Sequence, residues 1–340
     1  MGVREFGHGR LRQMPQQTPA RTTRRLRSRL VGFLRRRMRD VGWQWRDLPT
    51  GLVMIAPSAL VLGAFLVYPL VKTVSLGRQR CNESGTRCVT TGWDQYSDVW
   101  RSDEFQQALW VTGKFTLLVV PIGLALGIGL AMLADRYLRG IGIFRAIFSS
   151  TVATSVAVAS LMWFFLLQPD VGVIPNIGWV EDLFGVVKEP GLLRDPGTAL
   201  TSVAMSSVWA GLGFTFILVT AGLQGIPADL HEAAAIDGAG GFRRFWSVTL
   251  PMLGPTLLFV VVVLTSRAFQ AYGEIDLLTD GGPDPQQSTT TVTYLVYGDS
   301  SVVRSDAGLQ ATTAVWLFVI LLVLAALQLR GFGRRVHYGD

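Results

Sequence analysis

Three polar side chains lie close together in an otherwise apolar stretch, and their types suit the binding of a charged solute. Arg267, Gln270 and Glu274 occupy positions i, i+3 and i+7, which share one face of a helix. A charged side chain within a membrane span is costly and marks a candidate transport pathway. The arginine can bind a phosphate through two parallel hydrogen bonds, which favours a glycerol phosphate or a phosphodiester over a neutral sugar. Tyr272 lies beside these residues and joins the candidate pathway.

Other roles remain open for these side chains. Arg267 can instead extend its charged end to the outer lipid headgroups, or it can pair with Glu274. Trp163 and Trp209 are candidates for stacking on a sugar ring, although tryptophans in spans more often mark the membrane interface. An oligosaccharide therefore stays beside the anionic solute as a candidate.

The sequence lacks the groups of residues that catalysis in a membrane would need. Its three histidines, His8, His231 and His337, are scattered outside the apolar runs and are not paired with other catalytic residue types. It also lacks the G-x-x-x-x-G-K-[ST] loop that holds nucleotide phosphates. We therefore expect no catalytic residue, no metal site and no cofactor bound by this chain, and a membrane-embedded enzyme is the least favoured class.

Composition and the lengths of the apolar runs place the chain in a membrane. Of its 340 residues, 49% are hydrophobic and only 16% are charged, which is typical of a polytopic membrane protein. A helix of about 20 apolar residues crosses the hydrocarbon core. The runs predict an all-α protein with six transmembrane helices, at residues 52–76, 109–134, 143–167, 199–222, 251–273 and 307–329.

Basic residues determine the predicted orientation. Most of the 31 lysines and arginines lie on the side of the membrane that holds both termini, so both termini are expected in the cytoplasm. The predicted organisation is a basic cytoplasmic tail (1–50), a six-helix membrane domain (51–330) and a short cytoplasmic tail (331–340). The domain includes a cytoplasmic loop at 225–250 and an outer loop at 274–306.

The basic tail contains a periodic segment, residues 24–40, in which leucine or methionine recurs every four positions among arginines. This pattern predicts an amphipathic helix on an anionic lipid surface. A disordered tail whose charge only sets the topology is the alternative. Nucleic-acid binding is not expected, because no nucleic-acid-binding fold accompanies the charge.

Both cysteines, Cys81 and Cys88, fall in the first predicted outer loop. An oxidising environment there permits a disulfide that closes a small loop. Two free thiols are the alternative, because two cysteines are too few for a metal site.

The polar segment between the fourth and fifth runs predicts two short helices joined by a glycine turn. Asp229 and Glu232 place negative charge near the positive end of the first helix. Gly238, after Asp237, ends this helix because glycine readily adopts the left-handed cap conformation. The second helix carries aromatic residues on one face. Such an element at the cytoplasmic surface suits docking to a partner.

The sequence "EAAAIDGAGGFRRFWSVTLP" (232–251) resembles the EAA loop of ABC importer permease subunits, in the maltose and glycerol-3-phosphate branch. One departure is Val248, where isoleucine is more usual. The segment "LLTDGGPDPQQSTTTVTYLVY" (277–297) resembles the GGP-x-ST segment of the same branch, and the likeness covers about residues 50–330. The residues that we expect to couple the chain to an ATPase are Glu232, Ala233, Ala234, Asp237, Gly238, Ala239, Phe242, Phe245, Trp246 and Pro251.

The resemblance implies a type I permease fold whose coupling helix lies in the loop before the fifth span. It implies a heterodimer with a paralogous permease, two ATPase subunits that bind ATP and Mg, and an extracytoplasmic binding protein. The implied solute is a glycerol phosphate, a glycerophosphodiester or an oligosaccharide, and the implied location is the plasma membrane of a prokaryote. An ion-coupled secondary transporter is the alternative class, although inverted repeats and buried carboxylates would then be expected in the spans.

Overall fold

The computed structural model describes residues 48–81, 87–135, 140–177, 191–283, 287–298 and 306–333. The amphipathic helix predicted at 24–40 and most of the predicted C-terminal tail lie outside these residues. The chain divides into two compact units, residues 1–69 and 70–340, and each is described by itself.

The described part of the first unit is one apolar helix. It comprises α2 (Leu48–Leu62), a π-helical stretch (Gly63–Val67) and the first two residues of α3 (Tyr68–Leu76). Large apolar side chains such as Met54 and Phe65 are exposed. The apolar stretch as a whole, Pro49–Leu76, is long enough to cross a membrane. A helix that is apolar on all sides needs lipid or another apolar surface around it.

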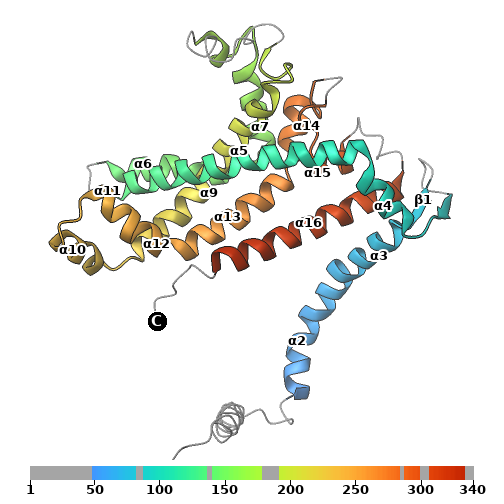
Figure 1. The fold of residues 1–340 in the computed structure, drawn as a ribbon, viewed down its shortest axis with the longest axis horizontal. Coiled ribbons are helices and arrows are strands. Elements are labelled where there is room, and N and C mark those ends of the chain that lie inside the picture. Colours follow the sequence, from blue (N-terminus) through green and yellow to red (C-terminus); the bar gives the residue numbers. More distant parts are fainter. Residues whose placement is uncertain are drawn as a thin grey trace, which may run out of the picture. The chain divides into compact units, whose positions relative to one another are not determined.

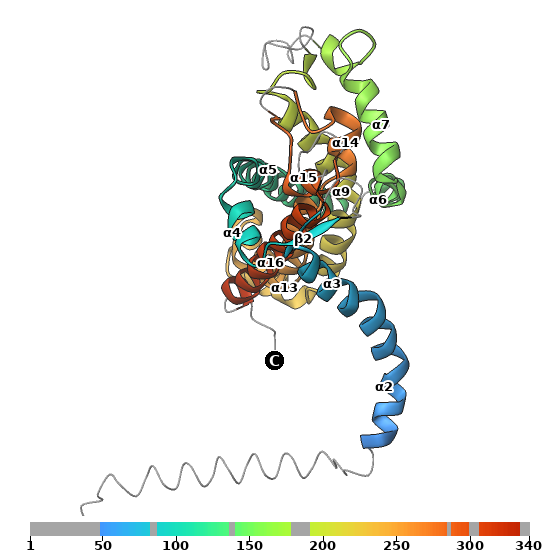
Figure 2. The same ribbon diagram turned by 90° about the vertical axis from the view of Figure 1, so that its right-hand side faces the viewer.

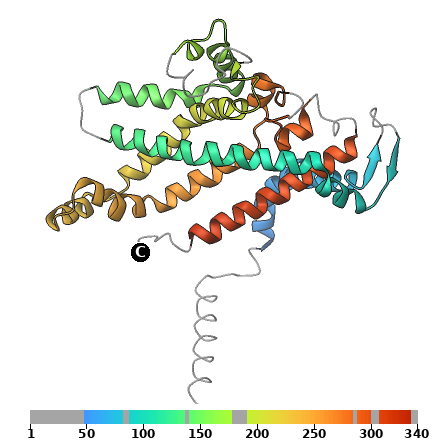
Figure 3. The same ribbon diagram turned by 45° about the horizontal axis from the view of Figure 1, so that its top comes forward.

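Long apolar helices form the core of the second unit, and they run along one another (Figures 1 and 3). They are α5 (Asp103–Ala134), α9 (Ala199–Gln224), α13 (Gly254–Phe269) and α16 (Ala307–Gly333). The hydroxyl of Ser102 caps α5 by accepting a hydrogen bond from the Phe105 amide. Phe115, Val203 and Val260 are fully buried in one core cluster, which joins α5, α9 and α13.

Two glycines allow α9 to approach its neighbours closely. A Cβ atom on Gly127 of α5 would overlap the side chain of Thr215 on α9. A Cβ atom on Gly213 of α9 would overlap Thr151, which directly follows α6 (Ile141–Ser150). Small residues at helix contacts permit the close backbone packing that stabilises helix pairs in membranes. These contacts hold α5, α6 and α9 together.

Two of the predicted spans are bent. The segment of α6 and the 3-10 turn after it meets α7 (Val156–Leu167) at 106°. The hydroxyl of Ser155 caps the start of α7 at this bend. The segment that runs from α11 (Gly241–Arg244) to Met252 meets α13 at 70°.

The prediction of six transmembrane helices is therefore met only in part. The described residues include four helices long and apolar enough to cross a membrane, or up to six if each bent pair is one span. The predicted span 251–273 is also interrupted at its outer end, because α13 ends at Phe269 and α14 (Gly273–Thr279) begins after a short turn. An apolar run does not reveal such breaks, since a serine cap or a proline can lie within it.

A small antiparallel sheet departs from the all-α prediction. Strand β1 (Gln79–Cys81) pairs with β2 (Cys88–Thr90), and Cys81 lies opposite Cys88. The two cysteines form a disulfide in the structure. The short polar strands lie between the apolar runs from which the helices were predicted, so that analysis could not detect them.

Hydrogen bonds attach this hairpin to the start of α16. The Asp306 carboxylate accepts hydrogen bonds from the amides of Cys81 and Gly308. Gln95, on α4 (Asp94–Arg101), is fully buried and donates to the Gln79 carbonyl oxygen and to Thr312. Two backbone groups of β1, the Cys81 amide and the Gln79 carbonyl oxygen, thus have partners at the start of α16 and on α4.

Tyr96 reinforces the same region from α4. Its hydroxyl donates to the Val74 carbonyl oxygen at 2.9 Å. Burial raises the pKa of Tyr96, and the nearby charge of Arg78 only partly opposes this effect. The hydroxyl therefore stays protonated and keeps its donor role at physiological pH.

Two short helices complete the outer part of the unit, and they are α14 and α15 (Val292–Tyr297). Helix α14 packs against α7, and the two lie side by side in Figures 1 and 2. A 3-10 turn (Ile174–Asn176) follows α7. The bend before α7 and the break before α14 therefore lie near one another.

The contact between Gly127 and Thr215 gives a prediction about stability. A Gly127→Leu substitution forces α5 away from α9, and such overpacking costs about 1–3 kcal/mol. We expect a lower melting temperature of the detergent-purified protein. Gly129→Leu is the matched control, because a Cβ atom on Gly129 meets no other atom within 4 Å. Equal melting temperatures for the two variants would contradict the close packing of α5 and α9.

Candidate functional site

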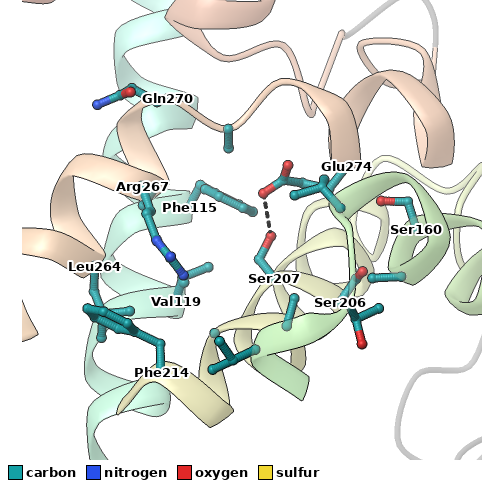
Figure 4. Close-up of a pocket in the computed structure, with 18 residues that line it drawn as sticks. Phe115, Val119, Ser160, Ser206, Ser207, Phe214, Leu264, Arg267, Gln270 and Glu274 are labelled. Carbon is teal, nitrogen blue, oxygen red and sulfur yellow. Dashed lines mark hydrogen bonds between the residues drawn. The ribbon is translucent and has the colours of Figure 1, made fainter. Parts of the chain in front are cut away.

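A polar cavity of about 350 Å³ lies among α5, α7, α9, α13 and α14 (Figure 4). It is bordered by the bend before α7 and by the break between α13 and α14. The polar side chains that line it are Thr154, Ser160, Ser206, Ser207, Arg267, Gln270 and Glu274. The structure thus brings together three of the residues that the sequence predicted for a solute pathway.

Arg267 provides the positive charge of the cavity. Its side chain is exposed, and its guanidinium carbon lies 4.7 Å from the centroid of the Phe214 ring. This contact is a cation–π interaction. Within the described part of the chain the one ion pair joins Arg80 and Asp98, so Arg267 is not paired with Glu274. The guanidinium donors therefore remain available to a bound anion.

Glu274 provides the negative charge, from the first turn of α14. Its Oε1 atom accepts a hydrogen bond from the Ser207 hydroxyl at 2.9 Å (Figure 4). Arg267 and Glu274 are separated along the chain by the turn between α13 and α14. The cavity therefore presents a cation and a carboxylate that are not neutralised by each other.

The sequence analysis missed the serines of this cavity. Ser160 is 1% exposed, and its hydroxyl has no hydrogen-bond partner among the described residues. Ser206 is equally buried, and Ser207 bonds to Glu274. Hydroxyl groups inside apolar runs were the available signal. The signal is weak, because serine often lies in spans and bonds to its own helix.

The two candidate tryptophans lie elsewhere. Trp163 and Trp209 line a separate, almost wholly apolar cavity of about 400 Å³ among α5, α7 and α9. Their rings meet edge to face, with centroids 6.4 Å apart. Neither ring lines the cavity that contains Arg267, so the geometry gives no support for their stacking on a solute bound there.

Gln270 and Tyr272 were both predicted for the solute pathway, but only Gln270 lines the cavity that contains Arg267. Tyr272 instead stacks on Tyr294, with ring centroids 6.0 Å apart. Tyr272, which follows the end of α13 at Phe269, thus packs against the hydrophobic core beside Tyr294.

The predicted cytoplasmic element forms helical segments around a glycine turn. Helix α10 (Ala228–Ile236) ends before Gly238, whose φ of +75° is the left-handed conformation expected there. The amides of Gly238 and Ala239 donate to carbonyl oxygens at the end of α10. In Figures 1 and 3 this element lies at the opposite end of the second unit from the β1–β2 hairpin.

Several side chains of this element are open to a partner. Glu232 and Ala233 are exposed, and Phe242 and Trp246 are 80% and 55% exposed. Phe242 and Phe245 each pack edge-on against Trp246. A cluster of large exposed apolar side chains is typical of a protein contact surface.

The sequence predicted one regular helix for the second half of the element, but the structure shows a π-helical stretch between two short α-helices. This half packs against the core through the residue that follows it. Residues Phe245–Thr249 are π-helical, and Leu250–Met252 then form the short helix α12. Leu253, which follows α12, is fully buried. A Cβ atom on Gly222 of α9 would lie 2.9 Å from Leu253. Movement of the element would therefore displace both α9 and α13.

Comparisons with known proteins identify this arrangement. Residues 121–337 match the family model described as the binding-protein-dependent transport system inner membrane component. The sn-glycerol-3-phosphate transport system permease protein UgpA of Agrobacterium fabrum is 34% identical, over 84% of this chain and 96% of the relative. The protein of the same name from Escherichia coli is 30% identical, over 84% of this chain and 95% of the relative.

A solved structure has the same fold. The bacterial ABC transporter involved in the import of the acidic polysaccharide alginate contains a chain that superposes with a TM-score of 0.69. The match covers 88% of this chain and 99% of that chain, at 20% sequence identity. The second unit therefore has the fold of an ABC importer permease, as the resemblance of the EAA loop implied.

The chain that matches this family model over most of its length thus has helices apolar enough for a membrane. It also has an exposed element around Gly238 and a charged cavity between bent helices. The relatives are named as permease proteins, which sets aside the ion-coupled transporter and the membrane-embedded enzyme. The chain belongs to the family of binding-protein-dependent transport system inner membrane components, and it is a transport subunit rather than an enzyme.

Proposed function

We propose that this permease subunit conducts sn-glycerol 3-phosphate, or a glycerophosphodiester, through the cavity between Arg267 and Glu274. The permeases named above serve sn-glycerol-3-phosphate transport systems. One observation carries the proposal: Arg267 lines the cavity and forms no ion pair among the described residues. A cation in a membrane protein is costly unless it meets an anion or water, and a phosphate can accept two of its hydrogen bonds.

The rest of the cavity suits a hydroxylated tail. Glu274 can accept hydrogen bonds from hydroxyl groups, and Ser160 can donate or accept. Ser207, whose proton is donated to Glu274, can accept one. The carboxylate of Glu274 would also repel a phosphate placed at the wrong end. A solute with an anionic head and a glycerol tail is therefore oriented with its head at Arg267.

An acidic oligosaccharide is the second candidate. The structural relative belongs to an importer of an acidic polysaccharide, and the same hydroxyl-binding wall could receive a sugar. Sugar sites usually offer an aromatic face, however, and Trp163 and Trp209 line the other cavity. The small phosphorylated solute fits the described lining better.

Energy for transport would come from separate subunits. In this proposal two ATPase subunits hold ATP and Mg, and α10 docks in a groove on one of them through Glu232 and Ala233. Closure of the ATPase dimer pulls the element, and Pro251 and Leu253 transmit the movement to α13 and α9. The cavity then changes its access from one side of the membrane to the other by a rigid-body rearrangement.

The assembly would contain a second, paralogous permease and an extracytoplasmic binding protein that delivers the solute. We place the chain in the plasma membrane with six spans, each bent helix pair counting as one. Both termini would face the cytoplasm because basic residues concentrate on that side. The tail 1–50 would lie on the inner leaflet, and the tail after residue 330 would lie in the cytoplasm.

Arg267→Ala gives the first functional prediction. Loss of a charge-assisted, bidentate contact should raise the KM for sn-glycerol 3-phosphate uptake about tenfold or more. Uptake is measured with radiolabelled solute in proteoliposomes that contain the whole importer. Lys114→Ala is the control, because Lys114 lies over Trp110 and does not line the cavity. An unchanged KM in the Arg267 variant would remove this residue from the solute site.

Glu232→Lys gives the second functional prediction. Charge reversal on the exposed face of α10 should abolish the stimulation of ATP hydrolysis by the loaded binding protein, because a basic partner group on the ATPase is repelled. Asp135→Lys is the matched control at the cytoplasmic end of α5, outside the element. Full stimulation in the Glu232 variant would show that α10 does not couple the two subunits through this charge.

A further inference from the structure

The threonine-rich segment after the GGP sequence has no part in the mechanism above, yet it is deeply buried. Thr289 and Thr291 are fully buried, and Thr290 and Thr293 are 6% and 5% exposed. A hydroxyl that is removed from water costs free energy unless it finds a hydrogen-bond partner. The partners of these hydroxyls therefore indicate what the segment holds in place.

Two of the hydroxyls cap the outer end of α13. Thr291 donates to the Ala271 carbonyl oxygen at 3.1 Å, and Thr293 donates to that of Phe269. Phe269 is the last residue of α13, where carbonyl oxygens lack partners within the helix. Ala271 lies in the turn before α14. Each hydroxyl thus satisfies a carbonyl oxygen that the helix break leaves free.

The helix that carries these threonines is itself anchored on several sides. Thr291 caps α15 by accepting a hydrogen bond from the Tyr294 amide at 3.2 Å. The Val292 amide donates to the Thr112 hydroxyl of α5 at 3.0 Å. The Tyr294 hydroxyl donates to Asp280, just after α14, at 2.7 Å. Helix α15 is therefore a fixed support against which the end of α13 is held.

The hydrogen bonds act on the turn that separates the two charged residues of the cavity. Arg267 lies in the last turn of α13, and Glu274 lies in the first turn of α14. Residues 270–272 connect α13 to α14 and include Ala271, whose carbonyl oxygen accepts the hydrogen bond from Thr291. Neither Thr291 nor Thr293 lines the cavity, so neither would touch a solute bound there.

We propose that Thr291 and Thr293 are positioning residues for the solute site. Their two hydrogen bonds set the distance between the cationic and the carboxylate ends of the cavity, and thereby the affinity for the solute. This inference rests on the proposed function of the cavity. The inference gives the hydroxyl group at these two positions a specific task, which serine could also perform.

The test compares Thr291→Val and Thr293→Val with the corresponding serine variants. Valine keeps the shape of threonine and removes the hydroxyl, whereas serine keeps the hydroxyl. Thr313→Val is the matched control, because among the described residues the buried Thr313 hydroxyl bonds only to the Leu309 carbonyl oxygen of its own helix. Hydrogen exchange of residues 268–276 is measured on the assembled importer by mass spectrometry. The KM and the maximal rate of sn-glycerol 3-phosphate uptake are measured on the same preparation.

The valine variants should show faster exchange in this segment and a KM raised about threefold or more, with a nearly unchanged maximal rate. The serine variants should restore the exchange rate and the KM, and Thr313→Val should leave both of these unchanged. Wild-type exchange in the valine variants overturns the inference. So does an unchanged KM, or a fall in the maximal rate alone, which indicates a merely structural role.

Failure of the proposed function is distinguishable from failure of this inference. If the wild-type importer takes up no sn-glycerol 3-phosphate, the proposed solute is wrong. The exchange measurement still decides whether the two hydroxyls hold the turn, because it requires no solute. Protected exchange in the serine variants together with fast exchange in the valine variants would retain the positioning role for whichever solute the wild-type importer carries.

Discussion

Inside a membrane every polar group needs a partner, because lipid offers neither water nor counter-charge, and this constraint governs the whole second unit. The carbonyl oxygens of Phe269 and Ala271, at the end of α13 and in the turn after it, accept hydrogen bonds from threonine hydroxyls. Against this background the cavity is an exception. Arg267 faces it without an ion pair among the described residues, and the Ser160 hydroxyl has no protein partner there. A few other buried polar atoms, such as Trp163 Nε1 and Thr220 Oγ1, also lack a partner among the described residues, but in this cavity such a group and an unpaired cation line the same space. In the proposed function, the solute supplies the missing partners.

The bends in the helices explain how such a cavity can exist. A straight bundle of apolar helices would fill its own centre, whereas the breaks before α7 and before α14 place serine hydroxyls and opposite charges around one space. The bend before α13 lies at the other end of this helix from Arg267. There Leu253 packs against α9 and connects the exposed aromatic element to the helix that carries Arg267. In the proposed function, docking, movement and solute binding would therefore all involve α13.

Much of this arrangement could be predicted from the sequence, for identifiable reasons. Apolar run length located the long helices, and the EAA-like segment located the glycine turn at Gly238, because one glycine and its cap leave a distinct pattern. Arg267 and Glu274 were conspicuous because charge is rare in apolar runs. The sequence did not reveal the β1–β2 hairpin, the bends or the serines of the cavity, since short polar strands and single hydroxyls leave no periodic signal. The sequence also could not show that Trp163 and Trp209 line a different cavity from Arg267, because residue type alone does not say which of two neighbouring cavities a side chain lines.

The central claim is that the guanidinium of Arg267 receives the phosphate of the solute inside this subunit. The most direct measurement is a cryo-electron microscopy structure of the assembled importer, trapped by a hydrolysis-deficient ATPase in the presence of sn-glycerol 3-phosphate and the binding protein. The account predicts phosphate density within hydrogen-bond distance of the Arg267 guanidinium, about 3 Å from nitrogen to oxygen, with the glycerol hydroxyls toward Glu274. Solute density elsewhere in the pathway, with Arg267 directed to the lipid headgroups, would contradict it.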